Sequence, residues 1–94
     1  MSFTPEIVKG DPLYDLIVRL VKKHLPEKII EIGSADGRGS TQAFIEGLGE
    51  SVENVEMICI EAHPGRYKEL CENVKDYSFI NSGLKKKDGG IETI

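Results

Sequence analysis

The 94-residue sequence has no tryptophan, only two cysteines and no long apolar run. Its apolar stretches are far shorter than the ~20 residues that a membrane-spanning helix needs, so we expect no membrane segment. Basic residues are outnumbered by acidic ones, 12 to 16, and the formal net charge is -4. Binding to nucleic acid or to an anionic membrane surface needs basic patches, and we expect neither partner. The one basic run, residues 85–87, precedes Asp88 and two glycines and indicates a solvated turn.

The two cysteines indicate neither a disulfide nor a metal centre. Cys59 lies in an apolar segment and Cys71 in a helical pattern, where free thiols act as small core residues. No other ligands are spaced to complete a metal site, so we expect none. The first residues show neither the apolar core nor the cleavage site of a signal peptide. These features predict a cytoplasmic protein with free thiols.

Turn-forming residues and apolar periodicity divide the chain into alternating helices and strands. Asp11 and Pro12 open the first helix, which Pro26 ends, so that residues 1–27 form a helical lead-in. Its apolar residues recur at helical spacing and are expected to face a core: Leu13, Leu16, Ile17, Leu20, Val21 and Leu25. The elements expected after it are strand 28–32, helix 40–48, strand 56–62, helix 66–75, strand 77–84 and the start of another strand in 85–94.

Three details of this series predict how its elements end and pack. Ser40 or Thr41 is expected to cap the second helix, and Gly47 and Gly49 to end it. The strand at 56–62 is a nearly continuous apolar run, which is typical of a sheet covered on both faces. The order helix, β-α-β-α-β and hairpin start predicts an α/β fold with a parallel sheet and right-handed crossovers.

The turn between the first strand and the second helix is the most informative segment. It reads IIEIGSADGRGST and places three glycines within seven residues. Ligands of parallel sheets bind at the carboxyl ends of the strands, where this turn lies. The small residues Gly33, Ala35 and Gly37 would let a ligand approach the main chain. Glu31 lies inside the apolar strand, where it needs donors or a cationic partner, and a ligand's ammonium group would supply one.

A second carboxylate, Glu61, ends the second strand. An acidic side chain at this position is well placed to accept hydrogen bonds from both hydroxyls of a ribose. Together, Glu31 and Glu61 predict a ligand with an amine at one end and a nucleoside at the other. S-adenosylmethionine (SAM) carries both groups.

Three segments resemble known sequence motifs. EIGSADGRGS resembles the first motif of class I SAM-dependent methyltransferases, an acidic residue and then glycine-x-glycine-x-glycine, with Ala35 in place of the middle glycine. CIEAHPGRYKELCENV resembles the second-strand motif of FkbM-type methyltransferases, and FINSGLKKKDGGIETI is similar to the segment that follows in that group. The resemblance covers residues 28–94. It implies methyl transfer from SAM to an acceptor, with O-methylation favoured.

The resemblance also implies cofactor-binding residues at the ends of three strands: Glu31, Gly33, Ser34, Ala35, Gly37, Glu61, Ala62, Asn81 and Ser82. The acidic residue of the first strand would hold the amino-acid end of SAM, and the small residues of the turn would line its methionyl and ribose region. Glu61 would bind the ribose hydroxyls, with Ala62 beside the adenine. Asn81 and Ser82, at the expected end of the third strand, would lie near the adenine edge.

The family that this sequence resembles has a sheet of about seven strands, and the sequence supplies three of them and the start of a fourth. The expected fold is therefore a partial Rossmann-like parallel sheet, truncated relative to the full fold, with residues 28–94 as its N-terminal half. The family keeps its acceptor and catalytic residues in the half that is absent, so neither can be assigned. The open sheet edge would pair with a second copy or with the missing C-terminal half.

Two other interpretations remain open. The glycine spacing of the turn also matches short-chain dehydrogenases, and Glu61 could bind the ribose of NAD(P). Against this, Glu31 would face a pyrophosphate unfavourably, and the dinucleotide fingerprint G-x-G-x-x-G is broken at Ala35 and Arg38. The other interpretation is a non-catalytic Rossmann-like remnant that oligomerises through its open sheet edge.

Overall fold

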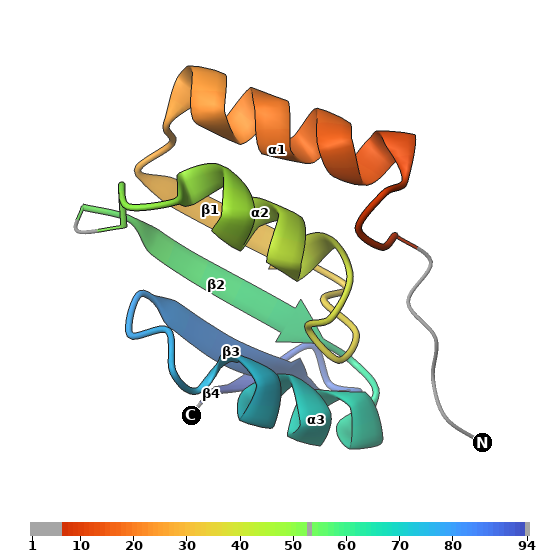
Figure 1. The fold of residues 1–94 in the computed structure, drawn as a ribbon. Coiled ribbons are helices and arrows are strands. Elements are labelled where there is room, and N and C mark those ends of the chain that lie inside the picture. Colours follow the sequence, from red (N-terminus) through yellow and green to blue (C-terminus); the bar gives the residue numbers. More distant parts are fainter. Residues whose placement is uncertain (1–6, 53, 94) are drawn as a thin grey trace.

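The computed structural model describes residues 7–52 and 54–93 as alternating helices and strands (Figure 1). In chain order these are α1 (Pro12–His24), β1 (Lys28–Ile32), α2 (Ser40–Leu48), β2 (Glu56–Glu61), α3 (Pro64–Val74), β3 (Ile80–Lys85) and β4 (Ile91–Thr93). No helix within the described ranges is long and apolar enough to cross a membrane.

The four strands form one sheet in the order β1-β2-β3-β4. β1 runs parallel to β2, with Ile30 beside Ile58, and β2 runs parallel to β3, with Cys59 beside Ser82. β4 runs antiparallel to β3 and forms the hairpin expected at the end of the sequence. These pairings confirm the predicted α/β fold with a partial parallel sheet.

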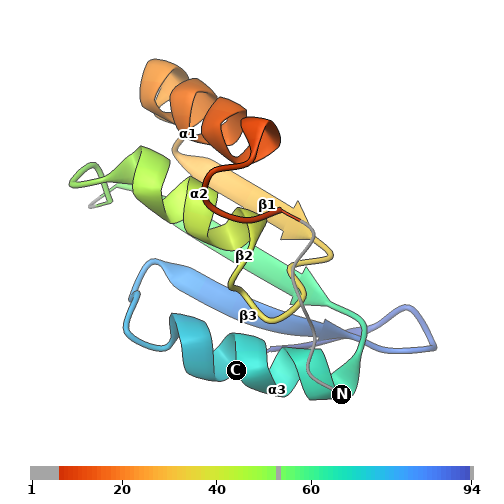
Figure 2. The same cartoon turned by 45° about the vertical axis from the view of Figure 1, so that its right-hand side comes forward.

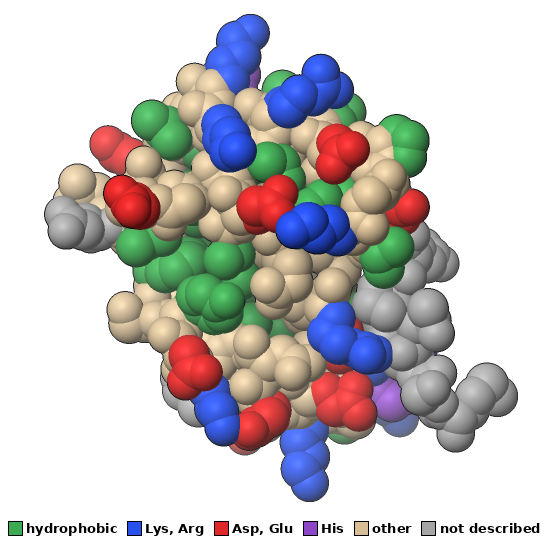
Figure 3. All heavy atoms as spheres, in the orientation of Figure 1, with side chains coloured by type: hydrophobic (Ala, Val, Ile, Leu, Met, Phe, Trp, Pro, Cys, Tyr) green, Lys and Arg blue, Asp and Glu red, His purple; other side chains and the backbone are tan. Residues whose placement is uncertain are grey.

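All three helices lie on one side of the sheet. α2 and α3 connect neighbouring parallel strands on the same face, and α1 packs on α2 (Figure 2). Side chains alternate along a strand, and those that point to this face form the core with the helices: Val21, Ile29, Leu48, Met57, Cys59, Leu70, Val74 and Ile80. On this side, hydrophobic side chains gather between α2 and α3, where partly buried residues pack on the core (Figure 3).

The opposite face of the sheet carries no helix in the described part of the chain. Ile30 and Ile32 of β1 are 57% and 80% exposed, and Ile91 of β4 is 52% exposed. Their neighbours on β2, Ile58 and Ile60, are half-buried. The prediction that the apolar run of β2 is covered on both faces is therefore wrong for this chain, because every crossover helix lies on the other side.

Helix α1 has two apolar stripes and not one. Tyr14, Val18 and Val21 are buried against α2. The predicted inward stripe is wrong for Leu13, Leu16, Leu20 and Leu25, which are 39–52% exposed. The helix is rotated so that the aromatic ring of Tyr14 and the two valines meet α2, and the leucine stripe faces outwards.

Close packing of α1 on α2 explains a glycine that the sequence had indicated as a helix end. Gly47 is buried inside α2, and a Cβ atom there would lie 2.6 Å from Cβ of Val21. Gly49 does follow the last turn, with φ +54°. Asp11 is the N-cap residue of α1, as predicted, but its carboxylate accepts a hydrogen bond from the Val8 N–H at 3.0 Å and makes no cap bond to the helix.

Two element starts differ from the sequence prediction. α3 begins at Pro64, two residues early, because the His63 side chain accepts a hydrogen bond from the Arg66 N–H and caps the helix. β3 begins at Ile80, three residues late, since a turn follows α3. In that turn the Tyr77 N–H donates to the Val74 carbonyl at 3.0 Å, and the Ile80 N–H to the Tyr77 carbonyl at 3.0 Å.

Candidate functional site

Glu31 is held by the first turn of α2. Its side chain is 7% exposed and points to the helix-covered face. The Ser40 hydroxyl donates to Oε2 at 2.5 Å, and the Thr41 hydroxyl donates to Oε1 at 2.5 Å. The buried carboxylate therefore has two hydrogen-bond donors within the chain. The sequence analysis expected a ligand's ammonium group as its partner. Neither hydroxyl caps α2, whose N-cap is Gly39.

Glu61 is held by main-chain donors from two different segments. It is 6% exposed at the end of β2. Oε1 accepts a hydrogen bond from the Ala35 N–H at 2.7 Å, and Oε2 accepts one from the His63 N–H at 2.9 Å. The carboxylate therefore joins the turn after β1 to the turn after β2, at the carboxyl ends of two neighbouring strands.

The two carboxylates lie on the same face of the sheet and on the same side of the turn after β1. Glu31 pairs in register with Cys59, two residues before Glu61, so the three side chains share one face. Ser40 and Thr41 hold Glu31 at one end of the turn, and Ala35 holds Glu61 at its middle. This is the convergence that the sequence predicted for the two acidic residues.

The turn itself stays open by taking an unusual backbone path. The N–H groups of Gly33 and Ser34 both donate to the Ile60 carbonyl, at 2.8 and 2.9 Å. Gly33 and Gly37 have φ of +82° and +81°, and Ala35, which is not glycine, has φ +54°. No atom lies within 4 Å of a Cβ built on Gly33. The turn therefore exposes main chain at Gly33 and has a strained residue at Ala35.

Gly37 is required for a different reason. A Cβ atom on it would lie 2.9 Å from Cδ1 of Leu70 and 3.4 Å from Cγ1 of Val74. The turn thus packs directly on α3. Asn73 of the same helix strengthens this contact, because its side-chain amide donates to the Asp36 carbonyl at 2.7 Å.

Sequence reasoning missed Asp36, which is fully buried in the turn. One carboxylate oxygen accepts from the Arg38 N–H at 3.0 Å, and the other accepts from the Arg38 Nε at 2.6 Å and lies 2.5 Å from Nη2. Its spacing of two residues from an arginine, within a glycine-rich turn, is a signal that could have identified it. Asp36 and Arg38 stiffen the turn from within.

The third strand does not bring its predicted residues to the site. Asn81 and Ser82 are the second and third residues of β3, which continues to Lys85. Ser82 pairs with Cys59 in the middle of the sheet and is buried, and Asn81 points to the bare face. Their predicted place at the strand's end is wrong, because β3 begins and ends later than expected. Ala62, by contrast, is exposed directly after β2.

Cys59 lies beneath the two carboxylates and is fully buried. Burial raises the pKa of its thiol to about 12, and the negative charge of Glu31 contributes in the same direction. Cys71 is half-buried, and both cysteines are free. The Cys59 thiol therefore remains protonated and acts as a small core side chain.

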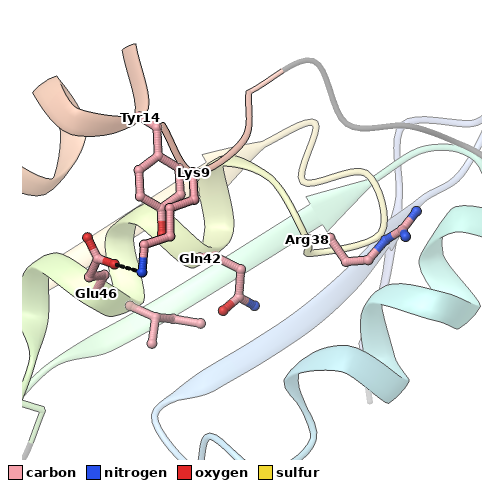
Figure 4. Close-up of a pocket in the computed structure, with 6 residues that line it drawn as sticks. Lys9, Tyr14, Arg38, Gln42 and Glu46 are labelled. Carbon is pink, nitrogen blue, oxygen red and sulfur yellow. Dashed lines mark ion pairs between the residues drawn. The ribbon is translucent and has the colours of Figure 1, made fainter. Parts of the chain in front are cut away.

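A pocket of about 350 Å³ lies beside the turn, between the segment before α1 and the outer side of α2 (Figure 4). Its lining residues are Lys9, Tyr14, Arg38, Gln42, Ile45 and Glu46. Lys9 and Glu46 form an ion pair at 3.4 Å, and Arg38 points away from them (Figure 4). The Gln42 amide donates to the Gly37 carbonyl at 2.8 Å, which ties this pocket to the turn.

Three solved structures of methyltransferases contain a region with a similar fold. SAH-bound PaMTH1, a methyltransferase from Podospora anserina, matches 74% of this chain with a TM-score of 0.64 at 22% identity. The carbon methyltransferase DszA matches 83% with a TM-score of 0.58 at 21% identity. A Staphylococcus aureus protein assigned as a caffeoyl-CoA O-methyltransferase matches 85% with a TM-score of 0.58 at 26% identity. The chain has the fold of part of a methyltransferase.

These matches concern only a part of each neighbour. The chain spans 30% of PaMTH1, 23% of DszA and 39% of the Staphylococcus aureus protein. No protein-family model matches the sequence, and no curated protein matches it either.

Proposed function

We propose that this chain is the SAM-binding portion of a methyltransferase similar to the FkbM type, with an oxygen atom as the favoured methyl acceptor. The observation that carries the proposal is the placement of Glu61 at the carboxyl end of β2, hydrogen-bonded to the main chain of the turn after β1. Support also comes from the methyltransferase structures that share the fold, one of which has SAH bound.

Glu61 has the capacity to bind a ribose without giving up its present partners. Each carboxylate oxygen accepts one main-chain hydrogen bond, and an ionised carboxylate offers about four lone-pair positions. Two positions therefore remain for the two hydroxyls of a ribose. The N–H groups of Ala35 and His63 fix the orientation of the carboxylate before the ligand arrives, which lowers the cost of binding.

The amino-acid end of SAM is assigned to the Glu31 side of the turn. The carboxylate attracts an ammonium group, and the open main chain at Gly33 leaves room for the methionyl part. Ser34 and Ala35 complete this wall, and Ala62 stands beside the adenine. SAM would supply an activated methyl group, and this chain's residues would orient it. The small-molecule acceptor is not identified, and no catalytic residue is assigned among the residues of this chain.

Calorimetric titration tests the proposal. We expect SAM and S-adenosylhomocysteine to bind more tightly than NAD, because the carboxylate of Glu31 would repel a pyrophosphate. Glu61→Ala should weaken SAM binding by about 1.5–3 kcal/mol, the range for hydrogen bonds to a charged group. Glu50→Ala is a matched control, since Glu50 is an exposed carboxylate after α2.

Three outcomes are distinguishable. Tighter binding of NAD than of S-adenosylhomocysteine would favour the dehydrogenase interpretation and overturn the proposal. Absence of binding by all three ligands, in a chain whose circular dichroism shows native helix content, would favour the non-catalytic remnant. Because Glu61 also holds the turn, Glu61→Gln is measured in parallel, with the free energy of unfolding of each variant.

A further inference from the structure

Gly37 lies at a point of the turn after β1 where the packing demands a glycine. Its φ is +81°, and a Cβ atom on it would lie 2.9 Å from Cδ1 of Leu70, so a side chain there would clash with α3. Glycine has access to more backbone conformations than any other residue, and the peptide groups on either side of it rotate more easily. The close packing on α3 therefore places a flexible residue in the middle of the turn.

Two side-chain amides hold the peptide groups that flank Gly37. The carbonyl of Asp36 belongs to the peptide group before it and accepts a hydrogen bond from Asn73 Nδ2 at 2.7 Å. The carbonyl of Gly37 belongs to the peptide group after it and accepts one from Gln42 Nε2 at 2.8 Å. Asn73 is a residue of α3 and Gln42 of α2, so each crossover helix holds one of the two peptide groups.

The N–H groups of the same two peptide groups are bonded within the turn. The Gly37 N–H donates to the Ser34 carbonyl at 3.1 Å, and the Arg38 N–H donates to Oδ1 of Asp36 at 3.0 Å. A peptide group is planar, so its C=O and N–H move together when it rotates. Rotation of either peptide group would therefore break two hydrogen bonds, one of them to a helix.

The two amide bonds contribute little to folding stability. Asn73 is exposed and Gln42 is half-buried, so water can replace either amide at the carbonyl that it holds. Both residues are also weaker helix formers than alanine, which offsets part of what their bonds contribute. The main effect of the bonds is to restrict the turn to one conformation. A site that is ordered before its ligand arrives binds that ligand at a lower cost.

We propose that Asn73 and Gln42 are positioning residues for the cofactor, which lock the peptide groups on both sides of Gly37 in the conformation that binds SAM. The inference rests on the proposed function, because the methionyl part of SAM is assigned to this turn. Neither side chain is assigned to contact SAM, and both act through the main chain of the turn. Their removal should therefore lower the affinity for the cofactor and leave the stability of the fold nearly unchanged.

Calorimetric titration with S-adenosylhomocysteine and with adenosine, beside urea unfolding, separates these two effects. Asn73→Ala and Gln42→Ala should each weaken the binding of S-adenosylhomocysteine by about two- to tenfold, which is the equivalent of one hydrogen bond. The binding of adenosine should weaken less, because adenosine lacks the methionyl part. Lys68→Ala is the control, since Lys68 is exposed and lies five residues before Asn73, on another side of α3.

Hydrogen exchange in the chain without ligand tests the locking itself. Asn73→Ala should speed the exchange of the Gly37 N–H, and Gln42→Ala that of the Arg38 N–H, since each N–H shares a peptide group with the carbonyl that is released. The expected factor is again about two to ten. The N–H of Leu70, a buried residue of α3, should keep its wild-type rate in both variants.

Two results would overturn the inference. The first is an unchanged affinity for S-adenosylhomocysteine in both variants, with a wild type that binds it. The second is a loss of affinity that is matched by an equal loss of unfolding free energy and by faster exchange throughout the chain, which would show a general structural role. A wild type that does not bind S-adenosylhomocysteine is a different failure, because it removes the proposed function and the cofactor role together. The exchange rates of Gly37 and Arg38 would then still decide whether the two amides lock the turn.

Discussion

The Ala35 N–H donates a hydrogen bond to Glu61 Oε1 over 2.7 Å, between two residues that are 26 positions apart in sequence. This bond fixes the turn after β1 against the end of β2. Ala35 also has a left-handed conformation with φ +54°, which is uncommon for a residue with a side chain. The hydrogen bond and the backbone strain thus occur at the same residue.

Ala35→Gly should therefore stabilise the protein. Left-handed backbone costs an L-residue about 1–2 kcal/mol, and glycine avoids most of this, although it gains entropy in the unfolded chain. We expect the free energy of unfolding to rise by about 0.5–1 kcal/mol in urea titrations. Ala62→Gly is the control, because Ala62 has no positive φ and should gain nothing. A lower free energy of unfolding in Ala35→Gly than in the wild type would contradict the inference that the backbone of Ala35 is strained.

Gly37 and Gly33 form a matched pair that separates strain from steric clash. Both have positive φ, +81° and +82°. A Cβ on Gly37 would lie 2.9 Å from Leu70, and a Cβ on Gly33 would meet nothing within 4 Å. Each change to alanine should cost about 1–2 kcal/mol from the backbone. Gly37→Ala should cost about 1–3 kcal/mol more, as overpacking does. Equal losses of unfolding free energy would contradict the contact with α3.

The sequence predicted the fold well because alternation of helix and strand restricts the topology. Glu31, Glu61 and the turn were found from position alone, since parallel strands end at the same edge. The same reasoning failed for the leucines of α1, because periodicity shows that a helix has an apolar side but not which of two stripes meets the core. It failed for Asn81 and Ser82 because strand ends depend on local turns such as the one at Tyr77.

Two features could not have been read from the sequence at all. The uncovered isoleucine face depends on which side the crossover helices take, and an apolar run looks the same whether one face or two are covered. The hydroxyl donors of Glu31 come from the next helix, and their approach depends on the turn's backbone path. The sequence had instead indicated Ser40 and Thr41 as helix caps.

The raised pKa of Cys59 predicts a loss of stability at high pH. In the unfolded chain the thiol titrates near its ordinary value of 9.0, and in the folded protein only near 12. Below pH 9 both states keep the proton and stability does not change. Above it the unfolded state loses the proton first, so the free energy of unfolding falls by up to about 1.4 kcal/mol per pH unit.

Urea unfolding of the wild type and Cys59→Ala between pH 8 and pH 10.5 isolates this contribution. Burial also raises the pKa of Tyr14, but that residue is present in both proteins and its contribution cancels. We expect the stability of the wild type to fall more steeply with pH than that of Cys59→Ala. Parallel curves above pH 9 would show that the thiol is more accessible than its burial indicates.

The hydroxyl groups of Ser40 and Thr41 both donate to Glu31, and their removal should lower stability by different amounts. Thr41 is fully buried, so Thr41→Val removes the hydroxyl that donates to Oε1 of Glu31 and should cost about 1–3 kcal/mol of unfolding free energy. Ser40 is half-buried, and water can replace its hydroxyl, so Ser40→Ala should cost less than about 1 kcal/mol. In a Glu31→Ala background the effect of Thr41→Val should nearly vanish, because the charge that needs the donor is gone. If Thr41→Val costs the same in both backgrounds, its hydroxyl serves the packing of α2 and not the buried carboxylate.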